Sequence, residues 1–101
     1  MTLTRVISTD SSIYKNIIES IIREYCSVTN PKLIIRVLNG IPNLEIDENG
    51  RVKHGATLNN LIAVVEMARK LFGPPAYFLA RRVISRIATN DIRKQLPDEL
   101  K

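Results

Sequence analysis

Apolar residues recur at intervals of three and four over long stretches of the chain, which is the spacing of helices that bury one face. The first stretch predicts a helix that begins among the capping residues at 9–12 and runs to about Tyr25. We expect residues 2–7 before it to be extended. Asn30-Pro31 ends this part of the chain, because proline disfavours helical backbone in the residue before it. The apolar stripe of this helix is Tyr14, Ile17, Ile18, Ile21, Ile22 and Tyr25.

The middle of the chain predicts a small β-hairpin. Two apolar residues alternate with two acidic ones over 44–47, and a short basic and apolar segment follows at 51–53. Asn49 and Gly50 readily adopt the positive φ of a primed hairpin turn, which would pair the two segments. Residues 33–37 fit either a strand or a short helix. Because two strands alone are marginally stable, the hairpin must pack on the helices.

Two further helices follow, joined in an αα-corner. The first runs from Thr57 to Phe72, where Gly73 favours a helix end and Pro74-Pro75 prevents continuation. The second begins near Pro75, because the backbone N–H that proline lacks has no hydrogen-bond partner in the first turn of a helix. The expected buried stripes are Leu58, Leu61, Ile62, Val65, Ala68 and Phe72 on the first and Ala76, Leu79, Ala80, Val83 and Ile87 on the second.

These elements predict an α+β, mostly helical fold with a small β-hairpin packed on three main helices. The chain forms one compact domain over 1–101, and we expect its ends at 1–8 and 95–101 to fray because the last segment has no core stripe. Of the 101 residues, 45% are apolar and 25% charged, the composition of a folded domain. A core of this size needs no disulfide or metal to support it.

Basic charge is concentrated in the second half of the chain. The formal net charge is +5, and residues 51–101 hold ten basic and four acidic side chains against five and six in 1–50. Arg82, Arg86 and Arg93 fall on one side of the last helix at successive offsets of four and seven residues. Such a ridge suits phosphate backbone, an anionic membrane surface or an acidic protein segment. The alternative is a solvated face that maintains solubility.

Candidate catalytic chemistry is scarce. Cys26 and His54 are the only residues of their kinds, which excludes an intramolecular disulfide and a cysteine-rich zinc site. Glu45, Asp47 and Glu48 cluster at the hairpin without metal-ligand spacing, as expected of solvated turn residues. We expect Cys26 to be a small buried hydrophobe and His54 to lead into the next helix, although His54 could instead extend an anion-binding surface. The sequence therefore predicts a protein that is not an enzyme and uses no cofactor and no metal.

Partners of several kinds remain open. No segment has the apolar length of a membrane span or the apolar centre of a signal peptide, so we expect an intracellular protein without a membrane partner. A small nucleic-acid-binding domain is the main alternative to protein binding, although the basic half offers only Phe72, Tyr77 and Phe78 for stacking bases. Tyr77 and Phe78 beside the ridge also suggest an apolar surface completed by another chain.

The segment from Leu44 to Phe72 resembles the C-terminal, nucleoprotein-binding domain of rhabdovirus phosphoproteins. In that family a small hairpin with a glycine turn precedes a basic residue and a helix with an aromatic end. The helix expected over 11–26 is similar to the opening amphipathic helix of the lyssavirus domain. The turn resembles that of the vesiculovirus domain at Gly50, Arg51, Val52 and His54. The following helix resembles that of the lyssavirus domain at Leu61, Ala68, Lys70 and Phe72.

The resemblance implies a non-catalytic adaptor excised from a longer viral phosphoprotein. Such a domain binds acidic segments of nucleoprotein on the nucleoprotein–RNA template, in the host cytoplasm or nucleus. It tethers the viral RNA polymerase, which the full-length protein binds, and contacts nucleic acid only indirectly. From charge and helical position, we predict the partner-binding residues to be Arg51, Lys53, Arg69, Lys70, Arg81, Arg82 and Arg86.

Overall fold

The computed structural model describes the backbone of residues 2–101 and the side chains from Ile13 onward. Within this part of the chain it confirms a mostly helical α+β fold with a two-stranded antiparallel hairpin. No helix in the described part combines the length and apolarity that crossing a bilayer requires. The elements are α1 (Thr2–Val28), α2 (Pro31–Leu38), β1 (Glu45–Ile46), β2 (Val52–His54), α3 (Leu58–Phe72), α4 (Pro75–Ile87), α5 (Asn90–Gln95) and the 3₁₀ turn η1 (Asp98–Leu100).

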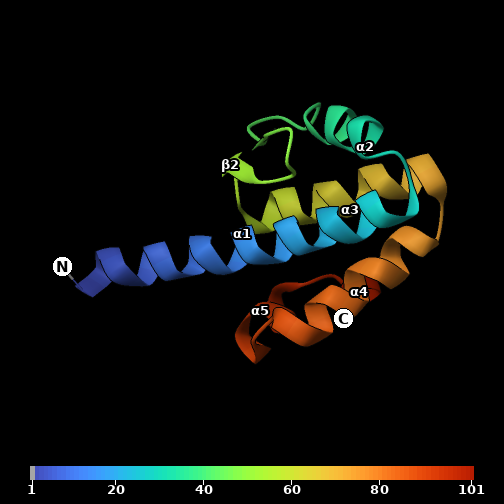
Figure 1. The fold of residues 1–101 in the computed structure, drawn as a ribbon. Coiled ribbons are helices and arrows are strands. Elements are labelled where there is room, and N and C mark those ends of the chain that lie inside the picture. Colours follow the sequence, from blue (N-terminus) through green and yellow to red (C-terminus); the bar gives the residue numbers. More distant parts are fainter. Residues whose placement is uncertain (1) are drawn as a thin grey trace.

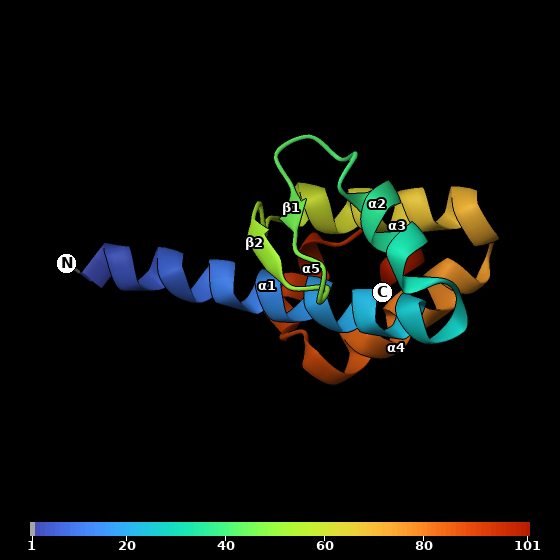
Figure 2. The ribbon, with the colours of Figure 1, turned by 45° about the horizontal axis from the view of Figure 1, so that its top comes forward.

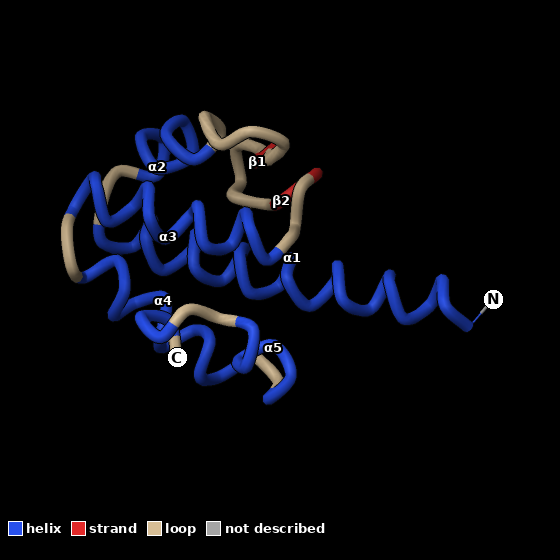
Figure 3. Tube along the Cα trace, turned by 180° about the vertical axis from the view of Figure 1, so that it is seen from behind, coloured by secondary structure: helices blue, strands red, loops and turns tan. Residues whose placement is uncertain are grey.

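The helices are arranged in layers around α1 and α3, which lie side by side (Figure 1). On one side, α2 and the hairpin cover this central pair, as Figure 2 also shows. On the other side lie α4, α5 and η1 (Figures 1 and 3). The hairpin and α4 are therefore separated by the central pair of helices.

Tyr25 joins α1 to both α3 and α4. Its hydroxyl donates a 2.9 Å hydrogen bond to the backbone carbonyl of Ala76, and its ring meets Phe72 edge to face at a centroid distance of 5.2 Å. Burial raises the pKa of this hydroxyl far above its ordinary value. The predicted α1 stripe is confirmed: Ile17, Ile18, Ile21, Ile22 and Tyr25 are buried and Tyr14 is partly buried.

The first helix is longer than predicted. It begins at Thr2, so the extended segment expected over 2–7 is wrong, and the candidate capping residues at 9–12 lie inside the helix. No glycine or proline interrupts residues 2–12, and extending an existing helix costs far less than starting one.

Residues 33–37 belong to α2, which decides between the two predicted alternatives. Pro31 occupies its first turn, and the side-chain oxygen of Asn30 accepts hydrogen bonds from the backbone N–H groups of Lys32 and Leu33 at 2.9 and 3.4 Å. The Asn-Pro pair therefore both follows one helix and starts the next.

The predicted hairpin is confirmed, but its turn differs. Ile46 pairs with Val52, and Gly50 has a φ of 83°, whereas Asn49 does not adopt a positive φ. The predicted primed turn is therefore wrong, because a primed turn centred on Asn49 and Gly50 requires a positive φ at Asn49 too. Instead, the carboxylate of Asp47 accepts 2.9 Å bonds from the N–H groups of Asn49 and Arg51, which stabilise the turn.

Side chains from two helices hold the hairpin. The amide of Asn39, just after α2, donates to the carbonyl of Ile46 at 2.9 Å and accepts from its N–H at 2.8 Å. Glu19 on α1 accepts a 2.9 Å bond from the N–H of Val52 and pairs with Lys15 at 3.0 Å. These contacts satisfy strand-edge groups that a two-stranded sheet would otherwise leave exposed.

The end of the chain also differs from expectation. Helix α4 stops at Ile87, Ala88 is extended, and the side chain of Thr89 caps α5. Leu96 and Leu100 are buried, so the prediction that residues 95–101 lack core contacts is wrong. The turn η1 instead packs on α4.

Candidate functional site

The seven predicted binding residues do not form one surface. Arg51 and Lys53 lie on the hairpin, whereas Arg81, Arg82 and Arg86 lie on α4, across the central pair of helices (Figure 1). Arg69 and Lys70 lie between these groups in sequence, in the last turn of the central helix α3. All seven are exposed. The structure thus separates the hairpin cations from those of α4.

The hairpin group has no excess of positive charge. Its two cations share the segment 45–54 with three carboxylates, Glu45, Asp47 and Glu48. Arg51 also lines a hollow of about 460 Å³ with Glu19 and Glu48. Cys26 borders the same hollow, and burial raises the pKa of its thiol, which disfavours the reactive thiolate.

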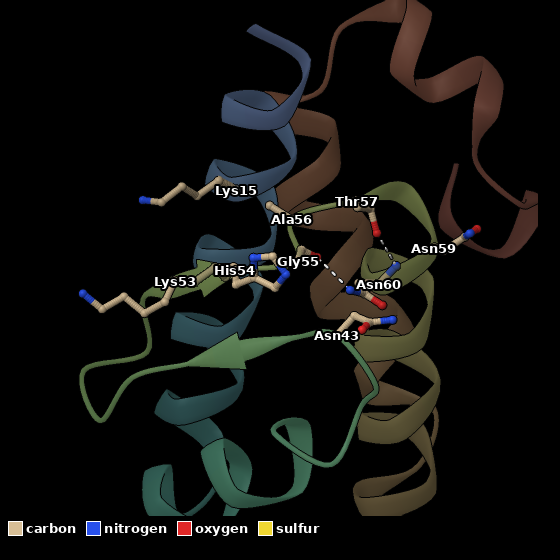
Figure 4. A pocket seen from close by; sticks show the side chains of 10 residues that line it. Lys15, Asn43, Lys53, His54, Gly55, Ala56, Thr57, Asn59 and Asn60 are labelled. Carbon is tan, nitrogen blue, oxygen red and sulfur yellow. Dashed lines mark hydrogen bonds between the residues drawn. The ribbon is translucent and has the colours of Figure 1, made fainter. Parts of the chain in front are cut away.

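A larger pocket of about 590 Å³ lies where β2 turns into α3 (Figure 4). Polar groups in its wall already form hydrogen bonds that stabilise this turn. The side-chain amide of Asn60 donates a 2.8 Å bond to the carbonyl of Gly55, and the Thr57 hydroxyl accepts a 3.1 Å bond from the backbone N–H of Asn60. Lys15 and Lys53 extend away from that wall. Among the described side chains, no group of three or more His, Cys, Asp or Glu residues could hold a metal ion.

The outer face of α4 is basic along its length. The helix buries Ala76, Leu79, Ala80 and Val83 of the predicted stripe, but it buries Ile84, which the stripe omitted, and leaves Ile87 only partly buried. The exposed positions follow the same 3.6-residue period on the opposite side. Apart from Pro75 at the start of the helix, they are Phe78, Arg81, Arg82, Ser85 and Arg86.

Arg93 does not continue this basic face. It lies on α5, beyond the extended Ala88, and is only partly exposed. The predicted ridge of Arg82, Arg86 and Arg93 on one helix is therefore wrong. Thr89 caps the N-terminus of α5, so Arg93 belongs to a separate helix and not to the face of α4.

The outer face of α4 meets the end of α3 in a sharp corner. Gly73 has a φ of 82°, and its N–H donates a 2.8 Å bond to the carbonyl of Arg69, which closes the last turn of α3. Pro75 then starts α4 at once. We call the surface formed here the α3–α4 corner, and it consists of Arg69, Lys70, Leu71, Tyr77, Phe78, Arg81 and Arg82.

Aromatic rings and guanidinium groups interleave in the α3–α4 corner. The Cζ atoms of Arg69 and Arg82 each lie 6.0 Å from a ring centroid, that of Tyr77 for Arg69 and that of Phe78 for Arg82. The Tyr77 hydroxyl donates a 2.6 Å bond to Glu66, and this carboxylate raises the pKa of the hydroxyl. Phe78 is 56% exposed. A cation over an exposed ring gives a surface both apolar and basic.

The predicted binding residues did not include Phe78. A sequence signal did exist, because Phe78 precedes Arg82 by four residues and so shares its side of the helix. The predicted stripe of this helix also left Phe78 out of the core, and the structure confirms that its ring is exposed. The binding residues were chosen by charge, which is why Phe78 was not among them.

Comparisons with known proteins add no relative to this picture. No protein-family model matches the chain, and neither the curated proteins nor the solved structures gave a match.

Proposed function

We propose that this chain is a non-catalytic adaptor domain that binds an acidic segment of a partner protein through the α3–α4 corner. The observation that carries the proposal is the exposed Phe78 ring under the guanidinium of Arg82, with three more cations on the same corner. A surface of this kind attracts carboxylates and offers an apolar contact at the same place.

Charge at the corner supports an anionic partner. Two carboxylates near Tyr77, those of Glu66 and Glu99, raise the pKa of its hydroxyl, and Glu66 already accepts the hydrogen bond from that hydroxyl. The cations of the corner are exposed. Exposed charges act over about 8 Å at physiological salt, so this local excess steers an acidic segment toward the corner.

For the identity of the partner, the resemblance to rhabdovirus phosphoproteins favours nucleoprotein. In that proposal the corner contacts an acidic segment of nucleoprotein in the ribonucleoprotein, and the rest of a longer phosphoprotein binds the viral RNA polymerase. The domain then tethers the polymerase to its template without binding RNA itself.

A nucleic-acid-binding domain is the alternative, and the separation of the two basic groups disfavours it. Proteins that bind single strands follow the phosphate backbone with a continuous basic groove. Here the cations at Arg51 and Lys53 lie across the central helices from those of α4. Of the three aromatic residues in the basic half, Phe72 and Tyr77 are partly buried and only Phe78 is exposed, so this surface offers a single ring on which a base could stack.

The test is binding of the domain to an acidic nucleoprotein-loop peptide and, in parallel, to short RNA and DNA at physiological salt. Two double variants change the charge equally: R81E/R82E in the corner and R51E/K53E on the hairpin. We expect peptide binding that is lost in R81E/R82E and retained in R51E/K53E. Tight RNA or DNA binding without peptide binding would replace the proposal with the alternative.

A further inference from the structure

We infer that the segment bound by the α3–α4 corner carries a large apolar side chain among its acidic residues, and that this side chain packs on Phe78 and its aliphatic neighbours. The inference rests on the proposed function and specifies its partner. It concerns the apolar half of the surface, which charge alone does not explain.

The exposed large apolar side chains gather at one end of the domain. Among the described residues these are Val28, Leu33, Leu71 and Phe78, between 38% and 57% exposed. Val28 ends α1, Leu33 lies in the first turn of α2, Leu71 in the last turn of α3 and Phe78 in the first turn of α4. Figures 1, 2 and 3 place the α1–α2 and α3–α4 connections at the same end, opposite the N-terminus. A partner's apolar side chain therefore has exposed apolar residues to pack on at this end of the domain.

Cations border this apolar end. Lys32 precedes Leu33, Lys70 precedes Leu71, and Arg82 covers one side of Phe78. A partner with carboxylates around an apolar side chain matches this arrangement of charge and apolar surface. A second copy of the chain is a poorer match, because it would bring its own border of cations against the first.

The chain itself contains a segment of the inferred kind. In residues 96–101, Leu96 and Leu100 are buried whereas Asp98 and Glu99 between them are exposed. The turn within this segment packs on α4, and the charge of Glu99 reaches Tyr77 of the corner. A segment with buried leucines and exposed carboxylates therefore already packs on α4 within this chain.

The experiment compares two labelled peptides made of Asp and Glu, one with a central Phe and one with Ser in its place. Fluorescence anisotropy gives their affinities for the domain and for its Phe78→Ala variant. We expect the domain to prefer the Phe peptide about tenfold or more, and Phe78→Ala to remove this preference, so that the variant binds the Phe and Ser peptides with similar affinity. Circular dichroism checks that the variant remains helical.

Other outcomes separate the two proposals. Equal affinity for both peptides, lost in R81E/R82E, would overturn this inference and leave the proposed function standing. No binding of either peptide or of the nucleoprotein-loop peptide would overturn both. A concentration-dependent dimer that Phe78→Ala dissociates, with no peptide preference, would replace the acidic partner with a second copy.

Discussion

Arg82 lies one helical turn after Phe78 on the outer face of α4, with its Cζ atom 6.0 Å from the centroid of the exposed ring. Each side chain limits the motion of the other while both remain open to a partner. The aromatic ring supplies apolar area at low entropic cost, and the guanidinium directs carboxylates to it. This pair is the centre of the surface to which we assign the binding function.

Exchanging Arg82 and Arg86 together for Glu should abolish binding of an acidic peptide while leaving the fold intact. Both side chains are exposed, so we expect the free energy of unfolding to change by no more than about 0.5 kcal/mol. Fluorescence anisotropy and urea unfolding give the two quantities. The control is R93E/K94E on α5, which changes the charge equally and should weaken binding much less. Equal losses in both variants would mean that only net charge matters.

Removing the Tyr25 hydroxyl should destabilise the domain. In Tyr25→Phe the carbonyl of Ala76 loses a buried hydrogen bond of 2.9 Å, and we expect a loss of about 1 kcal/mol in the free energy of unfolding. The matched control is Tyr14→Phe, which removes an exposed 3.0 Å bond to Gln95 and should cost less. If the control were as destabilised as Tyr25→Phe, burial would not be the reason for the effect.

Two glycines with similar backbone angles should differ in their tolerance of alanine. Gly73 and Gly55 have φ of 82° and 92°, and the ψ of −158° at Gly73 belongs to a region almost restricted to glycine, where an alanine costs about 1–3 kcal/mol. At Gly73 a Cβ atom would have its nearest neighbour at 3.9 Å, whereas at Gly55 it would lie 2.0 Å from the carbonyl oxygen of Asn43. Thermal unfolding should therefore show a smaller loss for Gly73→Ala than for Gly55→Ala. Similar melting temperatures would contradict this steric difference.

Stability should fall in acid partly through Asp47. The backbone N–H of Arg51, above all, lowers the pKa of this carboxyl in the folded protein by donating to its charged form. A carboxyl whose pKa is lower in the folded than in the unfolded state stabilises the protein fully at pH values above its unfolded-state pKa, near 3.9. This contribution to stability is lost as the pH falls through the folded-state pKa. Asp47→Asn should therefore flatten the decline of unfolding free energy below about pH 4. An unchanged decline would assign the acid sensitivity to other carboxylates.

Local signals predicted most of the elements and little of the binding surface. The hairpin, α3 and α4 follow from apolar spacing and from Gly50, Gly73 and Pro75, because these residues act within a few positions of themselves. The start of α1 was missed because capping residues inside a helix look the same in sequence as those at its end. Residues 33–37 stayed ambiguous because a short apolar run suits both a strand and a helix.

By itself, the sequence determined the mostly helical composition of the fold, the buried stripes of its main helices and the basic excess of its second half. These depend on residue type and on spacing along one element. The tertiary structure alone decided that Arg51 and Lys53 lie across the central helices from Arg81 and Arg82, and that the guanidinium of Arg69 on α3 lies over the ring of Tyr77 on α4. Such relations depend on how helices pack against one another over long separations in sequence, and spacing within one helix carries no information about them.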